Sequence, residues 1–449
     1  MKEHYLTIIL LLICFYSQAQ IVEIPDANFK NTLLYDIVVD TDGNGIPDSY
    51  ADTNHDGEIQ VSEAESIITL IVNDKNIISL EGIQSFINIE VLYCQYNKIT
   101  NLNFSENPEL IKLKCQYNEI TDLNITNNLK LEYLYCSENL IANIDLSHNI
   151  DLLTLICGDN PLNNLDLYNN INLTGLYCYM NQLTNLNISQ NLNLTHLYCP
   201  VNQLTSLDVS QNQNLDLLHF SDNQLTVIDV SQNSNLEELL FQNNQISNID
   251  VTQNFNLEVF WCFNNQITNL NVSQNSSLKN LRCHDNFLSS LDLSQNPALM
   301  WVYCYNTQLT NLNIKNGNNS NIETMLAFDN PNLICIQVDD ENATYPICDL
   351  NIPYNGWCKD NWAAYNENCN LGIEDYLQNS FTIFPNPTQD ILFIESHHPI
   401  ENVKVYNLQG QLIKEVLSKI VDVSQLTNGL YFVQVAYEGK SVTKKFIKE

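Results

Sequence analysis

The chain has 449 residues and a formal net charge of −34, with 18 lysines and arginines against 52 aspartates and glutamates. This length allows two or three domains with a sizeable core. Nucleic acids and anionic lipid surfaces are bound by cations, yet no lysine or arginine occurs between Lys130 and Lys279. The charge distribution therefore excludes nucleic acid as a partner and remains compatible with divalent cations.

Residues 1–20 have the pattern of a secretory signal peptide. Lys2 precedes the apolar run LTIILLLICF, and the small-residue segment SQAQ follows it. This run is too short to span a bilayer, and no other stretch approaches the ~18 apolar residues of a transmembrane helix. We therefore expect a mature chain without a transmembrane segment, secreted or displayed on the outer cell surface.

Residues 21–69 precede the repeats described below and contain an expected amphipathic helix at 24–38. The segment DTNHDGEIQVSE at 52–63 resembles an EF-hand or dockerin-type calcium loop, in which Gly57 would permit the sharp turn. The resemblance implies a structural calcium ion, with Glu58 contributing its carbonyl. The implied ligands are Asp52, Asn54, Asp56, Glu58, Gln60 and Glu63. An acidic, solvated turn without a metal is the alternative.

A second loop, DTDGNGIPD at 40–48, resembles the calcium repeats of the thrombospondin type 3 family. It offers Asp40, Asp42, Asn44 and Asp48, but Ala51 stands where a closing glutamate would be. We expect residues 21–69 to cap the open end of the repeats, because the terminal units of a repeat protein must differ from the inner ones.

A period of 21 residues runs through residues 70–334. Isoleucine or leucine recurs at this spacing from Ile78 to Leu309, and two asparagine columns run from Asn76 to Asn286 and from Asn107 to Asn296. One coil of this length cannot bury its apolar side chains, but stacked coils can. The alternation in segments such as LLHF predicts one short strand per coil, paired in parallel with its copies. The asparagines are expected to bond backbone groups in the turns.

The repeating unit LxxLxCxxNxLxxLDxSxN resembles the leucine-rich repeat in its short bacterial form. The resemblance implies a mainly β solenoid of the α/β-solenoid class. It also implies an arc whose strands line the concave face, with recognition as the usual role.

Nine cysteines follow the same period and could be metal ligands, disulfide partners, nucleophiles or core residues. They alternate with exposed positions and share their place with Phe220, Phe241 and Phe328. Phenylalanine can neither ligate a metal nor attack a substrate, whereas free cysteine packs as a small hydrophobic residue. We therefore expect this column to lie in the core. Its members are Cys94, Cys115, Cys136, Cys157, Cys178, Cys199, Cys262, Cys283 and Cys304.

Four further cysteines, in the segment 335–372, depart from the period. In a secreted, loop-rich segment they indicate two disulfides, for which three connectivities exist. We favour Cys335–Cys369 enclosing Cys348–Cys358 as a cap on the last coil. A zinc site is the alternative, although the segment lacks CxxC spacing.

Residues 373–449 change to short alternating strands, which predict a small immunoglobulin-like β-sandwich. These strings resemble the type A C-terminal sorting domain of the type IX secretion system of Bacteroidetes bacteria. The matching residues are Pro385, Asn386, Pro387, Gly429, Tyr431 and the terminal KKFIK. The resemblance implies that the secretion machinery is a partner, and that the protein is released or attached to the surface after removal of the tail.

Aromatic side chains gather on the strand positions that should face the concave side. The candidates for contact with a protein or glycan are Tyr133, Tyr135, Tyr177, Tyr179, Tyr198, Trp261, Phe263, Trp301, Tyr303 and Tyr305. Cross-strand packing is the alternative explanation, because aromatic residues stabilise sheets without any ligand.

An enzyme is not expected. His219, Ser221 and Asp222 are close in sequence, but same-face neighbours on a strand should lie about 7 Å apart, too far for a base to activate a nucleophile. No HExxH, GxSxG or phosphate-loop motif occurs. The sequence thus predicts a calcium-stabilised recognition or adhesion protein. A structural spacer without a specific ligand is the alternative.

Overall fold

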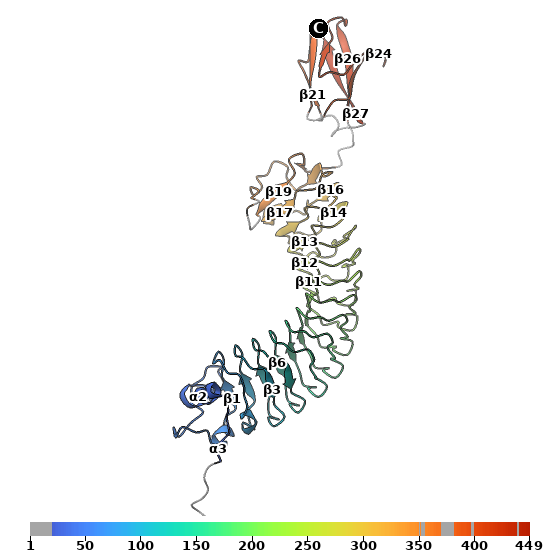
Figure 1. Cartoon of the computed structure of the whole chain (residues 1–449). Helices are drawn as coiled ribbons and strands as arrows, with labels where there is room; N and C mark the ends of the chain where they lie inside the picture. Colours follow the sequence, from blue (N-terminus) through green and yellow to red (C-terminus); the bar gives the residue numbers. More distant parts are fainter. Residues whose placement is uncertain (1–19, 350, 352–354, 370–380, 397–398, 438–439) are drawn as a thin grey trace, which may run out of the picture. The chain divides into compact units, whose positions relative to one another are not determined.

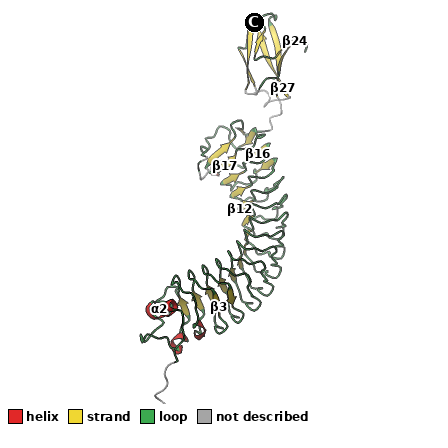
Figure 2. Ribbon diagram, viewed as in Figure 1, coloured by secondary structure: helices red, strands yellow, loops and turns green. Residues whose placement is uncertain are grey.

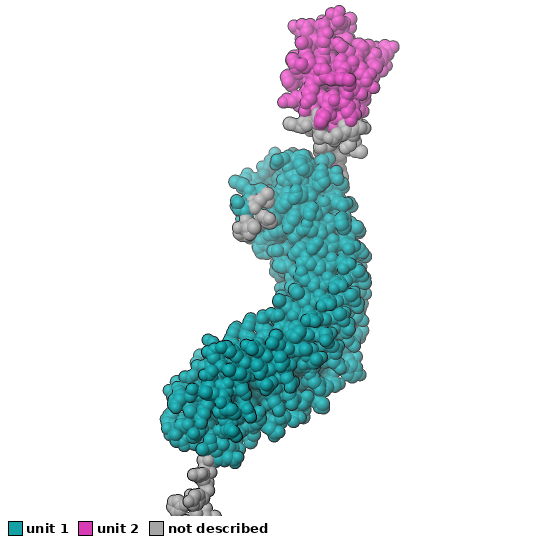
Figure 3. Space-filling model, in the orientation of Figure 1, with its two compact units in different colours: residues 1–367 teal, residues 368–449 magenta. Residues whose placement is uncertain are grey.

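The computed structural model describes residues 20–349, 351, 355–369, 381–396, 399–437 and 440–449. It divides into two compact units, at residues 1–367 and 368–449 (Figure 3). The expected signal peptide lies outside the described residues, apart from Gln20. Within the described part, no helix is both long and apolar enough to cross a membrane.

The first unit is a solenoid built on one parallel sheet of 14 strands (Figures 1 and 2). Figure 1 shows β11–β13 along the inner side of its curve. In sheet order the strands are β1 (Thr69–Ile71), β2 (Val91–Tyr93), β4 (Lys112–Lys114), β6 (Tyr133–Tyr135), β7 (Thr154–Ile156), β8 (Gly175–Tyr177), β9 (His196–Tyr198), β10 (Leu217–His219), β11 (Glu238–Leu240), β12 (Val259–Trp261), β13 (Asn280–Arg282), β15 (Trp301–Tyr303), β17 (Thr324–Ala327) and β19 (Gly356–Lys359).

Most of these short strands bury their middle residue and leave the outer two half-buried, facing away from the core. In β10, Leu218 is fully buried while Leu217 and His219 are half-buried. The strands pair in register, so that Leu218 lies opposite Leu197 and Leu239. The predicted solenoid with one parallel strand per coil is confirmed, because only stacking completes the core of a single coil.

Smaller parallel sheets lie elsewhere on the coils. One joins β14 (Ser290–Asp292), β16 (Asn311–Asn313), β18 (Cys335–Gln337) and β20 (Ala364–Asn366), and the other joins β3 (Asn101–Asn103) and β5 (Asp122–Asn124). A 3-10 helix, η2 (Asn319–Asn321), accompanies the insertion before β17.

The two asparagine columns bond the turns of successive coils together. In one column, Asn223 Nδ2 donates to the carbonyls of Cys199, Phe220 and Ser221, and its Oδ1 accepts from the Leu204 amide. In the other, the amides of the residues from Asn107 to Asn296 are fully buried and donate to carbonyls of the preceding coil. These side chains supply donors that the tight turns cannot obtain from the backbone.

The cysteine column lies in the core. Nine free cysteines are buried, and burial raises the pKa of each thiol, to about 12 for Cys157 and Cys199. Phe220 and Phe241 fill the same column and stack at 5.5 Å between ring centroids. The assignment of Phe328 to this column was wrong. Ala327 is the buried residue there, and Phe328 stacks on Tyr305 one position later, because the insertion shifts the register.

Residues 21–69 pack on the first coils as expected for a cap. Helix α2 (Ala27–Tyr35) buries Phe29, Leu33 and Leu34, and a short helix, α3 (Val61–Ala64), closes the calcium-like loop. Asp26 caps α2 through the Phe29 amide and also accepts from the amides of Ile78 and Ser79. A 3-10 helix, η1 (Ile83–Ser85), follows. Asp26 therefore bonds the cap to the solenoid, and Asp36 adds an ion pair with Lys75.

The solenoid does not end at residue 334, where we had placed its boundary. β18, β19 and β20 extend both sheets in parallel, because the segment after Leu333 forms one further, longer coil. In it Cys348 and Cys358 form a disulfide, and Cys335 and Cys369 are disulfide-bonded as well. Trp357 is buried and donates through Nε1 to the Ile322 carbonyl.

The second unit is a β-sandwich with its own core. One antiparallel sheet contains β21 (Phe381–Phe384), β22 (Ile391–Ser396) and β25 (Ile420–Asp422). The other contains β24 (Leu412–Val416), β23 (Asn402–Tyr406), β26 (Gly429–Tyr437) and β27 (Lys440–Lys448). Buried valines and Phe446 lie in the core. Asn386 Oδ1 accepts from the Ile447 amide, and Tyr431 Oη donates to the Thr427 carbonyl.

Candidate ligand-binding face and calcium loop

The ten aromatic residues singled out from the sequence all lie on the strand face or just after it. Every one is half-buried, which is the exposure expected of side chains that stand on a sheet and face away from the core. Because the strands are in register, the residues form columns across neighbouring coils rather than one continuous patch. Their ring geometry divides them into three clusters.

The central cluster consists of Tyr177, Tyr179, Tyr198 and His219. Tyr198 meets Tyr179 and His219 edge to face, with centroids 5.8 Å and 4.5 Å apart. Tyr179 lies directly over Gly158, where an added Cβ would come within 2.4 Å of its ring. Edge-to-face contact covers only one face of one ring in each pair. The cluster therefore keeps aromatic faces available to a ligand.

The C-terminal cluster is more tightly packed. The Arg282 guanidinium lies between the rings of Trp261 and Tyr303, 4.1 Å and 4.7 Å from their centroids. In the next column Phe263, His284 and Tyr305 stack at 4.4 Å and 4.3 Å. Trp301, in the first column of β15, lies opposite Asn280 and Thr324. Much of the aromatic surface here is covered by neighbouring strands, as the sheet-packing alternative expects.

The N-terminal cluster combines lysines and tyrosines. Lys112 Nζ lies 5.5 Å from the Tyr133 centroid and Lys114 Nζ lies 5.4 Å from that of Tyr135, and both ammonium groups also approach Tyr93. Lys112, Lys114 and Arg282 were not among the site residues predicted from the sequence. The signal that could have found them is the scarcity of cations elsewhere in the repeats.

The predicted separation of His219 and Ser221 was wrong. His219 Nε2 lies 2.9 Å from Ser221 Oγ, because the long histidine side chain spans the gap between the two backbone positions. Ser221 is only 2% exposed, and burial lowers the pKa of His219 to about 4 despite the opposing effect of Asp222. Asp222 Oδ1 accepts from Asn243 Nδ2. A nucleophile shielded from solvent cannot meet a substrate, so the pair is a structural hydrogen bond.

The loop at 52–63 is a tight turn held by hydrogen bonds to its own amides. Gly57 adopts a φ of 88° and donates its amide to Asp52 Oδ2, while Asn54 and Asp56 accept from amides two residues ahead. Asp52 is 2% exposed, and its Oδ1 is buried without a hydrogen-bond partner. Such an oxygen normally needs a donor or a cation. The donor set of carboxylates, amides and one carbonyl fits calcium.

Two other features of the loop bear on the metal. Glu63 accepts from the amides of Thr53 and Gln60. The Glu58 carboxylate pairs with Lys30 Nζ at 2.6 Å, so the predicted role of Glu58 as a calcium ligand would fall to its carbonyl. Within the described residues, no group of three or more His, Cys, Asp or Glu side chains is gathered as a metal site. Binding would thus require Glu63 to exchange amide donors for the ion.

The second loop is organised differently. Both Asp40 oxygens accept from the amides of Gly43 and Gly45, and Asp48 accepts from the amide and hydroxyl of Thr41. The carboxylates that we assigned to a second ion are thus bonded to their own turn, and Asp42 and Asn44 are exposed.

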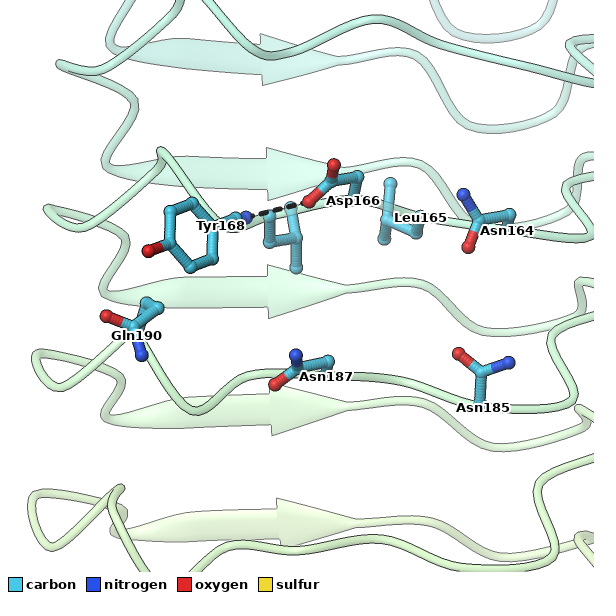
Figure 4. Close-up of a pocket in the computed structure, with 8 residues that line it drawn as sticks. Asn164, Leu165, Asp166, Tyr168, Asn185, Asn187 and Gln190 are labelled. Carbon is cyan, nitrogen blue, oxygen red and sulfur yellow. Dashed lines mark hydrogen bonds between the residues drawn. The ribbon is translucent and has the colours of Figure 1, made fainter.

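Aspartates at the turns of several coils accept hydrogen bonds from amides two residues ahead. Figure 4 shows one such place, an open pocket of about 180 Å³ between two coils, where the Tyr168 amide donates to Asp166 Oδ1 at 3.0 Å. Hydrogen bonds from Ser210 likewise lower the pKa of Asp208. A shallow pocket lined by such turn residues offers no convergent catalytic groups.

Comparison with solved structures identifies the fold class. The functional domain of InlJ from Listeria monocytogenes, whose structure includes a cysteine ladder, is 23% identical over 87% of this chain and 93% of its own, with a TM-score of 0.51. The internalin InlF from Listeria monocytogenes is 22% identical over 73% of this chain and 100% of its own (TM-score 0.61). A leucine-rich-repeat protein from Leptospira interrogans is 23% identical over 62% and 79% (TM-score 0.56). The first unit therefore has the leucine-rich-repeat fold.

The tail gives the second step of the identification. Residues 382–449 match the family of secretion system C-terminal sorting domains. The chain thus joins a solenoid with the leucine-rich-repeat fold to a type IX sorting tail, and the tail indicates that it is secreted or held at the cell surface. Comparison with curated protein sequences gave no significant match.

Proposed function

We propose that the protein recognises a protein partner through the concave strand face of its solenoid, as a secreted or surface-bound adhesion module. The observation that carries the proposal is the central cluster around Tyr198, whose edge-to-face rings stand half-exposed on a rigid sheet. Half-exposed aromatic residues are typical anchors of protein interfaces. Internalins and a TDR receptor among the structural neighbours support a role in recognition.

The matched experiment compares the wild-type chain with a Tyr177→Ala, Tyr198→Ala variant against immobilised extracellular-matrix proteins and glycans. We expect a protein bound by wild type to be lost in the variant. A Tyr168→Ala variant is the control, because Tyr168 is exposed in a turn away from the strand face. Circular dichroism establishes that all variants are folded. Equal binding by the double variant and wild type would refute the proposal.

The spacer function remains a second candidate, favoured by one specific observation. The stack of Phe263, His284, Tyr305 and Phe328 covers its ring faces from strand to strand and needs no ligand to explain it. A spacer would tolerate loss of the central tyrosines, so the experiment above separates the two functions. If wild type binds a glycan and no protein, the ligand is a glycan.

We further propose that calcium stabilises the N-terminal cap through Asp52, Asn54, Asp56, Glu58, Gln60 and Glu63. Asp52 Oδ1 supplies the buried, unpartnered oxygen that supports this assignment. When bound, the ion would satisfy that oxygen and join both ends of the loop. Saturating calcium at 100 times the dissociation constant would stabilise the cap by about 2.7 kcal/mol.

Calcium binding is measured by isothermal titration calorimetry. Its effect on stability is measured by thermal unfolding with and without calcium. We expect wild type to bind calcium, and we expect Asp52→Asn and Glu63→Gln to weaken that binding strongly. Asp42→Asn, in the second loop, is the matched control. Heat of binding that survives both changes would place the ion elsewhere, and its absence in wild type would leave the loop an acidic turn.

A further inference from the structure

The strand face differs in charge from the rest of the protein. In the 14-stranded sheet, the outer positions of the strands from β2 to β15 carry three cations, Lys112, Lys114 and Arg282, and a single carboxylate, Glu238. The chain as a whole has a net charge of −34. Its carboxylates lie instead beside the strands, for example Glu132 and Glu258 before them and Asp159 and Asp285 after them. The face is thus a cationic and aromatic surface with acidic margins.

These three cations are not paired, although carboxylates are abundant. Other lysines of the first unit form ion pairs, such as Lys130 with Glu109 and Lys279 with Glu258. In the described part of the chain, Lys112, Lys114 and Arg282 contact aromatic rings and form no ion pair with a carboxylate. In a chain this acidic, an unpaired guanidinium on the inner face needs an explanation.

The geometry around Arg282, the only arginine of the chain, restricts what it can bind. Trp261 and Tyr303 cover the two faces of the guanidinium, so it can donate only along its edge. That edge matches a carboxylate in bidentate geometry. The sandwich also leaves Arg282 Nε, Trp261 Nε1 and Asn280 Oδ1 buried without partners. Each unmet polar group costs stability in the free protein, so the arrangement is not optimised for folding alone.

We propose that the concave face binds an extended acidic segment of a partner protein, with one carboxylate on Arg282 and another at Lys112 and Lys114. This inference rests on the proposed function and specifies its partner. Eight strand spacings separate β4 from β13, which is about 38 Å at ~4.8 Å per strand. An extended chain covers this distance in about 12 residues. A polypeptide fits better than a glycan because the same face offers half-buried apolar anchors, such as Ile156 and Leu217, between the cations.

The test measures fluorescence anisotropy with the full chain after residue 20 and a labelled 20-residue peptide of alternating glutamate and serine. The matched peptide has glutamine in place of glutamate, and oligogalacturonate is the acidic glycan. We expect the glutamate peptide to bind at least tenfold more tightly than the glutamine peptide and the glycan. We also expect binding to weaken as salt rises, since charge attraction between exposed groups is screened.

The variants locate the contact. Arg282→Gln and the pair Lys112→Gln, Lys114→Gln should each weaken binding about tenfold, as expected for loss of a charge-assisted hydrogen bond. Arg282→Lys should fall between wild type and Arg282→Gln, because it keeps the charge and loses the fork. Lys279→Gln removes a cation already paired with Glu258 and should not change the affinity. Thermal melts verify that each variant is folded.

Three results would overturn the inference: equal affinity for the two peptides, wild-type affinity in Arg282→Gln, or binding of the glycan alone. If any of these occurs while the Tyr177→Ala, Tyr198→Ala variant still loses a matrix protein, the proposed function stands and only the acidic partner is refuted. If no protein is lost in that variant either, both fall.

Discussion

Replacing one buried asparagine of the turn column should destabilise the solenoid measurably. Asn233 is fully buried, and its Nδ2 donates to the carbonyls of Val209 at 3.0 Å and Asn212 at 2.8 Å. Asn233→Ala removes these two hydrogen bonds, each worth about 0.5–1.5 kcal/mol. Each carbonyl keeps a second donor, the Asn212 amide for Val209 and the Leu215 amide for Asn212. Loss of the unpartnered Oδ1 offsets part of the cost, so the net loss should be about 1–2 kcal/mol.

The assay is equilibrium unfolding in urea, followed by circular dichroism, with calcium held constant. Gln232→Ala is the control, because Gln232 is the exposed neighbour and should change stability by no more than about 0.5 kcal/mol. Asn233→Asp should cost more than Asn233→Ala, since it sets an acceptor against two carbonyls. If Asn233→Ala and Gln232→Ala unfold at the same urea concentration, the donors of the column do not hold the coils together.

Further predictions concern the thiols and the stacked histidine. The nine free cysteines should not react with a soluble disulfide reagent in the native state at pH 8, because each is buried and its thiol pKa is raised. All nine should react after unfolding in urea. Rapid labelling in the native state would contradict their assignment to the core. Burial lowers the pKa of His284 to about 4, against the opposing charge of Asp285. Between pH ~6.5 and 4 the unfolded chain therefore binds more protons at His284 than the folded chain does. The free energy of unfolding consequently decreases, by roughly 3 kcal/mol at most, as pH falls through that window. His284→Phe keeps the stack between Phe263 and Tyr305, and its free energy of unfolding should decrease less than that of wild type as pH falls. If the two proteins show the same pH dependence, His284 is not its cause.

Periodicity predicted the fold well because each repeated residue has one physical role. A leucine or cysteine that recurs every 21 residues can only be a core column, and a buried asparagine column can only serve the turns. The errors arose where that logic did not apply. Phe328 follows an insertion whose effect on register depends on how the longer coil packs, and the His219–Ser221 contact depends on side-chain rotamers. The solenoid boundary was missed because β19 and β20 have no repeat signature.

The candidate site was only partly predictable for a related reason. Sequence identified the aromatic columns, but not that Trp261 and Tyr303 enclose Arg282 while Tyr198 meets its neighbours edge to face. These differences depend on which side chain lies opposite on the neighbouring strand. The period determines how the backbones pair, but it does not determine how the rings orient. The loop at 52–63 differs from these columns, because the spacing of its carboxylates and amides is local and can be read from residue types alone; that it binds calcium stays a prediction.

Comparison among the coils favours a ligand over sheet packing as the reason for the strand-face residues. Exposed positions on the turns repeat closely, as with Ser-Gln at 189–190, 210–211, 231–232, 273–274 and 294–295, so exposure by itself does not produce variety in this chain. The column before the cysteine, by contrast, changes from lysine to tyrosine, isoleucine, histidine, tryptophan and arginine along the sheet. Packing alone would be satisfied by one aromatic residue repeated in every coil. The backbone of the sheet is uniform, but the side chains on its face differ from coil to coil. Such a surface is suited to an extended partner whose own chemical groups vary along its length.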